Sequence, residues 1–275
     1  MAQRQFKVGY GTRVLVTGAA SGLGRALSAA CVSRGARVML ADINSTREVS
    51  RALGAGASYD VHVDVSQPDS VSEMIDRTVS TLGGIDVVFN NAGVAAAGPL
   101  DKSTLEDWEW IRSIDLDGVI YVARAAIPVL KQNSSGWIVN TASLAAFAQA
   151  PLMSYYNVCK AGVVALSETL WAELAENNIG VSALCPGFFQ TGLVDTFRTT
   201  HPGQRKFVEK VMAKSKLTAD SVAQMTLRGM ERGELYIVPP GVARGTWYLS
   251  RFLPRLARRF VAGGPRKKKG VDRPG

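Results

Sequence analysis

Short runs of β-branched and aliphatic residues alternate along the chain with longer segments whose apolar residues recur every three or four positions. The short runs are typical of buried strands, and the longer segments are typical of amphipathic helices. Strands are expected at about 13–17, 37–41, 58–63, 86–89, 136–141, 179–185 and 235–238, and helices at about 22–34, 45–54, 68–82, 104–132, 154–177 and 218–231. This alternation predicts an α/β fold, a single domain with a doubly wound, parallel, seven-stranded sheet covered by helices on both faces.

A glycine-rich turn, Thr17-Gly18-Ala19-Ala20-Ser21-Gly22-Leu23-Gly24, follows the first expected strand and leads into a helix. Glycines at these spacings permit a tight turn, close approach of a pyrophosphate and close packing of helix on strand, and the helix N-terminus attracts the phosphates. A flexible turn without a ligand is the alternative, but the flanking strand and helix favour a Rossmann-type site. The residues expected to contact the dinucleotide are Gly18, Ser21, Gly22, Leu23 and Gly24.

The second expected strand ends at Asp42, about 20 residues beyond the glycines. A carboxylate at this place accepts hydrogen bonds from the adenosine ribose and repels a 2′-phosphate. The sequence therefore favours NAD over NADP, although Arg47 is close enough in sequence to keep NADP as the second choice.

Tyr156 and Lys160 are four residues apart at the start of an expected helix, so their side chains lie on the same face. A neighbouring ammonium lowers the pKa of a phenol from its ordinary value of about 10. We therefore expect Tyr156 to exchange a proton with a substrate near neutral pH. This spacing also occurs by chance in amphipathic helices, so the interpretation depends on the rest of the chain.

The glycine turn, the Tyr156–Lys160 pair and four further motifs make the chain resemble the short-chain dehydrogenase/reductase family over about residues 12–238. The motifs, in the order typical of the family, are the glycine turn, Asp64-Val65, Asn90-Asn91-Ala92-Gly93, Ser143, Tyr156-x-x-x-Lys160, and Pro186-Gly187 with Thr191. The resemblance implies an NAD(P)-dependent oxidoreductase that acts on CH–OH groups.

The resemblance also implies a role for each matched residue. Tyr156 would be the general acid/base, Lys160 would lower its pKa and bind the nicotinamide ribose, and Ser143 would orient the substrate oxygen. The remaining implied cofactor contacts are Asp64 and Val65 at the adenine, Asn91, Ala92 and Gly93 at the adenosine ribose, and Pro186, Phe189 and Thr191 at the nicotinamide.

Asp115 departs from the family pattern, since it stands where the family usually has an asparagine that bends its helix and holds a proton-relay water. A carboxylate there would stabilise the Lys160 ammonium but oppose a tyrosinate. We expect catalysis with Asp115 taking part in it. The alternative is a dinucleotide-binding scaffold or sensor with weak or no catalysis.

The connection at about 188–217 is long and rich in apolar residues, which is typical of a functional lid. With Ala145, Ala146, Phe147 and Leu152 it predicts a pocket for a lipophilic secondary alcohol or ketone, such as a steroid, terpenoid or fatty derivative. Ordinary packing is the alternative for these apolar residues. Lysines recur along the same connection, so an anionic substrate group is a further alternative to a solvated face.

The net charge of +9 comes entirely from the C-terminal end, since residues 244–275 hold ten Lys or Arg residues and one acidic residue. We therefore divide the chain into a catalytic Rossmann domain (1–243) and a basic extension (244–275). The extension is expected to form an amphipathic helix kinked at Pro254, followed by a disordered polybasic tail. It predicts either contact with an anionic membrane surface or packing on the body, and disfavours nucleic acid.

The remaining composition indicates a cytoplasmic protein, with no apolar run long enough to span a membrane and no room for a signal peptide before the first strand. The three cysteines are expected to be buried thiols, and the two histidines form no ligand cluster, so no metal is expected. The family resemblance suggests a homodimer or homotetramer formed through the helices at about 104–132 and 154–177.

Overall fold

A computed structural model describes residues 4–190, 196–199, 201 and 203–262. Seven strands form one parallel sheet in the order β3-β2-β1-β4-β6-β7-β9. Their bounds are β1 (Arg13–Thr17), β2 (Arg37–Asp42), β3 (Ser58–His62), β4 (Val87–Asn90), β6 (Gly136–Thr141), β7 (Ile179–Leu184) and β9 (Tyr236–Ile237). The strand order reverses beside β1, and open α/β sheets bind their ligands at such a point.

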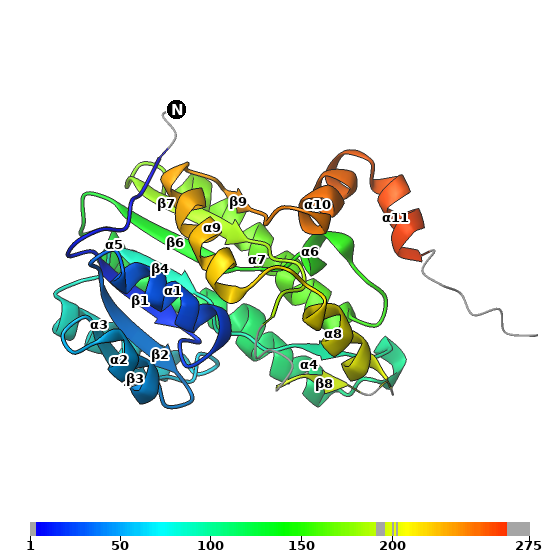
Figure 1. Ribbon diagram of the computed structural model, residues 1–275, viewed down its shortest axis with the longest axis horizontal. Coiled ribbons are helices and arrows are strands. Elements are labelled where there is room, and N and C mark those ends of the chain that lie inside the picture. The colour runs from blue at the N-terminus through cyan, green and yellow to red at the C-terminus, as the bar shows by residue number, and fades with distance from the viewer. Residues whose placement is uncertain (1–3, 191–195, 200, 202, 263–275) are drawn as a thin grey trace, which may run out of the picture.

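Helices cover both faces of the sheet, as Figure 1 shows. The larger helices are α1 (Gly22–Val32), α3 (Pro68–Leu82), α4 (Leu105–Arg112), α5 (Gly118–Leu130), α7 (Ser154–Glu173), α8 (Gln204–Ala213), α9 (Ala219–Glu231), α10 (Val242–Phe252) and α11 (Pro254–Ala262); the shorter ones are α2 (Arg47–Leu53), η1 (Leu100–Lys102), η2 (Ser113–Asp117) and α6 (Ala145–Ala148). The expected α/β architecture with seven parallel strands is confirmed.

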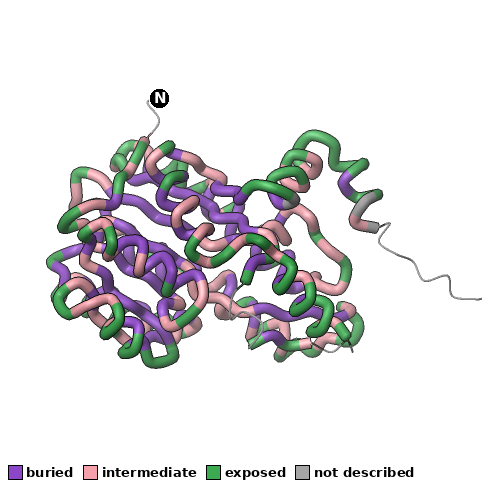
Figure 2. Tube along the Cα trace, viewed as in Figure 1, coloured by how far each residue is buried: buried purple, intermediate pink, exposed green. Residues whose placement is uncertain are grey.

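Alternate residues of the strands belong to two separate cores, one on each side of the sheet. In β1, Val14 and Val16 pack with α1 and α9, whereas Leu15 packs with α3, α5 and α7. Successive side chains of a strand point to opposite faces, so a sheet covered on both sides needs continuous apolar strands. The buried residues accordingly follow the strands through the centre of the molecule (Figure 2).

Two features of the structure differ from the expected elements, and a third agrees with them. The single helix expected at 104–132 consists of α4 and α5 joined by η2, a wider turn of π geometry that carries Asp115. A short second sheet pairs β5 (Ala96–Ala97) with β8 (Arg198–Thr199). The C-terminal helix is divided at Leu253, as the proline at position 254 predicts, and α10 and α11 lie beside α6.

Candidate active site

A cleft of about 350 Å³ opens at the carboxyl ends of the central strands. Its lining joins the glycine turn after β1, the ends of β2 and β4, the segment after β6, the first turns of α7 and the connection after β7. Segments that are far apart in the sequence therefore meet at the point where the strand order of the sheet reverses.

The glycine turn fits a phosphate group because side chains are excluded from it. Gly18 has φ +68°, a conformation that favours glycine, and a Cβ atom there would lie 2.9 Å from the Cα of Ala92. A Cβ atom on Gly24 would lie 2.0 Å from the Gly18 carbonyl oxygen, which shows how closely α1 packs on the turn. Asn91 holds the turn from the next strand, since its Nδ2 donates to the Thr17 carbonyl at 3.0 Å.

Asp42 lies at the end of β2 with its carboxylate fixed at the wall of the cleft. Its Oδ2 accepts a hydrogen bond from the Ala20 backbone N–H, and its Oδ1 accepts one from the Asn44 N–H, both at 2.9 Å. Arg47 is exposed and does not line the cleft. The negative charge of Asp42 therefore lies in the cleft without Arg47 beside it.

Tyr156, Ser143 and Lys160 meet where β6 and α7 border the cleft. The Ser143 hydroxyl lies close enough to Tyr156 to lower the pKa of the phenol, and the Lys160 Nζ lies 5.7 Å from the centre of the Tyr156 ring. Lys160 donates to the Thr141 carbonyl at 3.1 Å. A phenol, a hydroxyl and an ammonium thus stand within reach of one bound molecule.

The segment before α7 has an unusual backbone. Gln149 and Leu152 have positive φ angles of 50° and 65°, which residues other than glycine rarely adopt. Two hydrogen bonds hold this segment: the Asn157 Nδ2 donates to the Ala150 carbonyl at 2.9 Å, and the Gly98 N–H, from a distant part of the chain, donates to the Leu152 carbonyl at 2.7 Å. These contacts fix the start of α7, and with it the position of Tyr156.

Asp115 lies behind Lys160 and is fully buried. Its Oδ1 accepts a hydrogen bond from the Val94 N–H at 2.7 Å, and its Oδ2 lies 3.1 Å from the Lys160 Nζ. A Cβ atom on Gly93 would lie 3.3 Å from Asp115 Oδ1 and 3.5 Å from Lys160 Nζ. The π turn and the absence of a side chain at position 93 together place a carboxylate against the ammonium.

The electrostatics of this group differ from the expectation for an isolated tyrosine–lysine pair. Burial raises the pKa of Tyr156 above its ordinary value; Lys160 opposes this rise and Asp115 adds to it. Burial alone would lower the pKa of Lys160, but Asp115 and Tyr156 raise it above its ordinary value. The expected lowering of the Tyr156 pKa is therefore wrong, because removal of the phenolate from water outweighs its attraction to Lys160.

The cleft brings together nearly all the residues expected from the sequence. The lining includes Gly18, Ser21, Gly22, Leu23, Asp42, Asp64, Val65, Asn91, Ala92, Gly93, Ser143, Tyr156, Lys160, Pro186 and Phe189. Gly24 and Asp115 do not line the cleft, but Gly24 packs against Gly18 and Asp115 contacts Lys160. Thr191 lies outside the described residues.

The apolar end of the cleft differs from the expectation in several residues. Phe188, Phe197, Val208 and Met212 line it, but Phe207 is 55% exposed and belongs to the outer face of α8. Ala145 lines the cleft, whereas Ala146 and Phe147 line a second cavity behind α6 and Leu152 lines neither.

Sequence reasoning missed other lining residues, among them Ile43, Asn44, Ile114, Thr141, Ala142 and Met153. Ile43 directly follows Asp42 and Ala142 directly precedes Ser143, so their places beside motif residues at strand ends were a usable signal. The other residues enter the cleft through the way the chain folds.

Within the part of the chain that the structure describes, no group of three His, Cys, Asp or Glu residues could hold a metal ion. The three cysteines are buried and free, and burial raises the pKa of each thiol to about 12. The reactive groups at the cleft are therefore the phenol, the serine hydroxyl and the buried ion pair.

Known proteins are similar to this chain in sequence. The sequence pattern of the family described as short chain dehydrogenase matches residues 12–202. A 3-oxoacyl-[acyl-carrier-protein] reductase of Thermotoga maritima is 35% identical over 185 residues, covering 66% of this chain and 75% of the relative. Meso-2,3-butanediol dehydrogenase of Serratia marcescens is 33% identical over 184 residues, covering 66% of this chain and 73% of the relative.

A solved structure extends the likeness over most of the chain. A short chain dehydrogenase/reductase from Burkholderia phymatum, crystallised in complex with NAD, has a TM-score of 0.84 and 32% sequence identity. The match covers 91% of this chain and 96% of the other. The fold of the two proteins is therefore the same.

Proposed function

Since this chain belongs to the short-chain dehydrogenase/reductase family and is an oxidoreductase acting on CH–OH groups, we propose that it interconverts a lipophilic secondary alcohol and its ketone with NAD. The observation that carries this proposal is the meeting of Tyr156, Ser143 and Lys160 in the cleft that also contains the glycine turn. A dinucleotide and a substrate bound in one cleft can exchange a hydride directly.

The choice of NAD rests on the shape and charge of the cleft. The glycine turn leaves room for a pyrophosphate, and Asp42 presents a carboxylate where a ribose hydroxyl would donate to it and a 2′-phosphate would be repelled. NAD is the ligand of the Burkholderia phymatum structure, which supports the same choice. When bound, NAD supplies the hydride acceptor.

Tyr156 is the proposed general acid/base. Its raised pKa keeps the phenol protonated at neutral pH, so it can give a proton to the oxygen of a ketone during reduction. Alcohol oxidation needs the phenolate and should therefore become faster as the pH rises. Ser143 lies beside the phenol and would donate to the same substrate oxygen as negative charge develops on it.

Asp115 and Lys160 form a unit in this proposal. Lys160 provides the positive charge that opposes the rise in the Tyr156 pKa, and Asp115 keeps the lysine protonated in a place shielded from water. In the alternative function, a dinucleotide sensor, the repulsion between the Asp115 carboxylate and the Tyr156 phenolate outweighs the attraction by Lys160. NAD would then bind without turnover of a substrate.

The substrate class follows from the apolar end of the cleft. Val94, Met153, Phe188, Phe197 and Met212 line it. The lysines of α8 are exposed, because this helix directs Val208 and Met212 into the cleft and its lysines outward. These observations support a lipophilic substrate over one that carries an anionic group.

A homodimer or homotetramer is part of the proposal. Ile120 on α5 and Val158 and Trp171 on α7 are large apolar residues with 37%, 54% and 38% of their surface exposed. Such residues on two neighbouring helices suit contact with a second copy of the chain.

The proposal is tested by oxidation of two sets of secondary alcohols, one lipophilic and one of short polar chains, each with NAD and with NADP. We expect kcat/KM to be highest for lipophilic alcohols with NAD. Binding of NAD without turnover of any alcohol or ketone would favour the sensor instead.

A further inference from the structure

The two C-terminal helices contact the rest of the protein along only one side. Ala243 and Ala257 are buried, and the Trp247 ring packs against that of Tyr236 with centroids 5.6 Å apart. Figure 1 shows α10 and α11 beside α6, at one end of the molecule. One side of the helix pair is thus left without a partner in the described chain.

That outer side is apolar. Tyr248, Phe252, Leu253 and Leu256 have 51%, 70%, 56% and 43% of their surface exposed, and they follow one another across the junction of the helices. The rings of Tyr248 and Phe252 are stacked, with an angle of 19° between their planes. Monomeric soluble proteins rarely leave a contiguous patch of large apolar side chains uncovered, so the patch indicates a binding surface.

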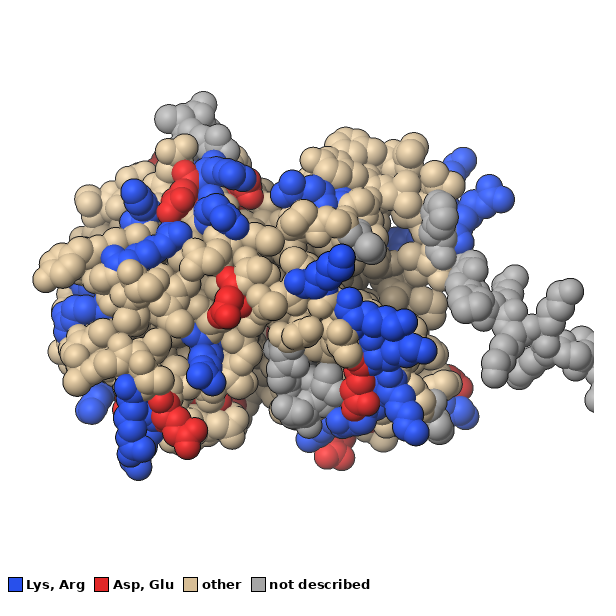
Figure 3. Space-filling model, viewed as in Figure 1, with Lys and Arg blue, Asp and Glu red and all other residues tan. Residues whose placement is uncertain are grey.

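Arginines lie beside this apolar patch. Arg255, Arg258 and Arg259 are exposed, and Arg258 also borders a cavity next to α6. Arg244 donates to the Val238 carbonyl at 3.2 Å, and Arg251 forms an ion pair with Glu168 at 3.6 Å. The sequence of α10 and α11 contains no acidic residue. On the face shown in Figure 3, the basic side chains around these helices accordingly have no acidic ones among them.

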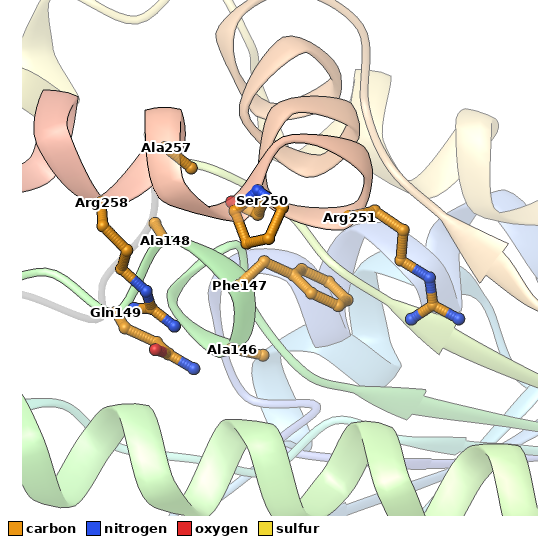
Figure 4. A pocket seen from close by; sticks show the side chains of 9 residues that line it. Ala146, Phe147, Ala148, Gln149, Ser250, Arg251, Ala257 and Arg258 are labelled. Carbon is orange, nitrogen blue, oxygen red and sulfur yellow. The ribbon is translucent and has the colours of Figure 1, made fainter.

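A cavity of about 230 Å³ lies between these helices and α6. Figure 4 shows the Phe147 ring in its centre, Arg258 next to Gln149 at one end and Arg251 at the other. Ala148 of α6 borders both this cavity and the candidate active site. The basic helices therefore lie directly behind the wall of the substrate cleft.

The distribution of charge decides which partner suits this surface. Residues 244–275 hold ten Lys or Arg residues and one acidic residue, so two copies joined through this face would bring like charges together. An anionic bilayer offers both negative phosphates for the arginines and an apolar layer for the aromatic side chains. A membrane surface matches both properties of the patch.

We propose that α10 and α11 dock the protein on the surface of an anionic lipid bilayer, with Tyr248, Phe252, Leu253 and Leu256 entering the interface and the arginines contacting lipid phosphates. The helices lie in the membrane plane, as amphipathic helices of this kind do. None of the described helices is long and apolar enough to cross a bilayer, so the contact is peripheral.

Vesicle flotation of the full-length protein tests this inference. Vesicles of phosphatidylcholine mixed with phosphatidylglycerol are compared with vesicles of phosphatidylcholine alone, at low and at high salt. We expect binding to the mixed vesicles only, weakened by salt. The triple variant Arg255→Gln, Arg258→Gln, Arg259→Gln should bind about 100-fold more weakly, and the variant Phe252→Ser, Leu256→Ser about tenfold more weakly.

Matched controls change the same residue types elsewhere on the surface. Arg51→Gln with Arg77→Gln removes exposed arginines from α2 and α3, and Leu105→Ser removes an apolar side chain that is 81% exposed. These variants should bind as the wild type does. All variants should retain NAD binding in solution, which separates this test from that of the proposed function.

Three results would overturn the proposal. They are no binding of the wild-type protein to the mixed vesicles, equal binding to both kinds of vesicle, and unchanged binding of the two helix variants. A concentration-dependent self-association that the Phe252→Ser, Leu256→Ser variant loses, without vesicle binding by the wild type, would assign the patch to a second copy of the chain.

Discussion

The Oδ2 atom of Asp115 lies 3.1 Å from the Nζ atom of Lys160, and neither side chain is more than 5% exposed. The carboxylate acts on two neighbours with opposite consequences. It raises the pKa of Lys160, which keeps the ammonium charged, and it also raises the pKa of Tyr156, which opposes the phenolate. Burial is the main cause of the raised pKa of Tyr156, and Asp115 moves the pH range in which the site can work as a base further upward.

Replacing Asp115 with asparagine should move the pH dependence of alcohol oxidation. The amide keeps the oxygen that accepts from Val94 but removes the charge that raises the Tyr156 pKa. The phenolate then forms at lower pH, so the rising limb of kcat/KM should shift to lower pH. The control Asp117→Asn removes a partly exposed carboxylate two residues away and should leave the limb in place. An upward shift would contradict this account, since it would mean that the main effect of Asp115 is to keep Lys160 charged.

Asp115→Ala should destabilise the protein more than Asp115→Asn does. Both variants leave the buried Lys160 ammonium without its counter-charge, and loss of one partner of a buried ion pair costs about 3–5 kcal/mol of unfolding free energy. Only the alanine also leaves the Val94 N–H without its acceptor, which costs about 1–3 kcal/mol more. Urea unfolding followed by circular dichroism measures this difference, and equal midpoints for the two variants would contradict it.

Asp42→Asn should weaken the preference for NAD. The amide retains the shape of the side chain but no longer repels a 2′-phosphate, and it accepts weaker hydrogen bonds from a ribose. The ratio of kcat/KM with NAD to that with NADP should fall by about 10- to 100-fold. Asp60→Asn, an exposed carboxylate on the neighbouring strand β3, should leave the ratio unchanged. An unaltered ratio in the Asp42 variant would remove this residue from cofactor selection.

Gly24→Ala should abolish tight binding of NAD. Its Cβ atom would lie 2.0 Å from the Gly18 carbonyl oxygen, so α1 must move away from the turn that cradles the phosphates. Gly9→Ala is a suitable control because no atom lies within 4 Å of its Cβ position. Fluorescence titration with NAD should show a large loss of affinity for the first variant and none for the second. Wild-type affinity in Gly24→Ala would refute the packing argument.

Much of the fold was predictable because its signals are local. The apolar strands, the glycine turn after β1 and the carboxylate at the end of β2 can each be recognised within a few residues. The proline at 254 likewise predicted the break between α10 and α11, which the structure confirms. For these features, the residues within a short segment determine its conformation, and the prediction agrees with the structure.

The features that were not predicted depend on contacts between distant segments. The direction of the Tyr156 pKa shift depends on burial, which only the assembled cleft determines. Phe207 and Val208 are neighbours in sequence, yet α8 turns one outward and the other into the cleft. The helical pattern alone could not say which side of α8 would face the protein.

The most direct test of the proposed chemistry compares Tyr156→Phe with Tyr155→Phe. Both remove one phenolic hydroxyl, but Tyr155 is packed edge-on against Trp108 and does not line the cleft. Steady-state oxidation of the best alcohol should fall by about 100- to 10,000-fold in Tyr156→Phe, with NAD affinity close to that of the wild type. Tyr155→Phe should retain most of its turnover. Wild-type turnover in Tyr156→Phe would contradict the assignment of this residue as the general acid/base.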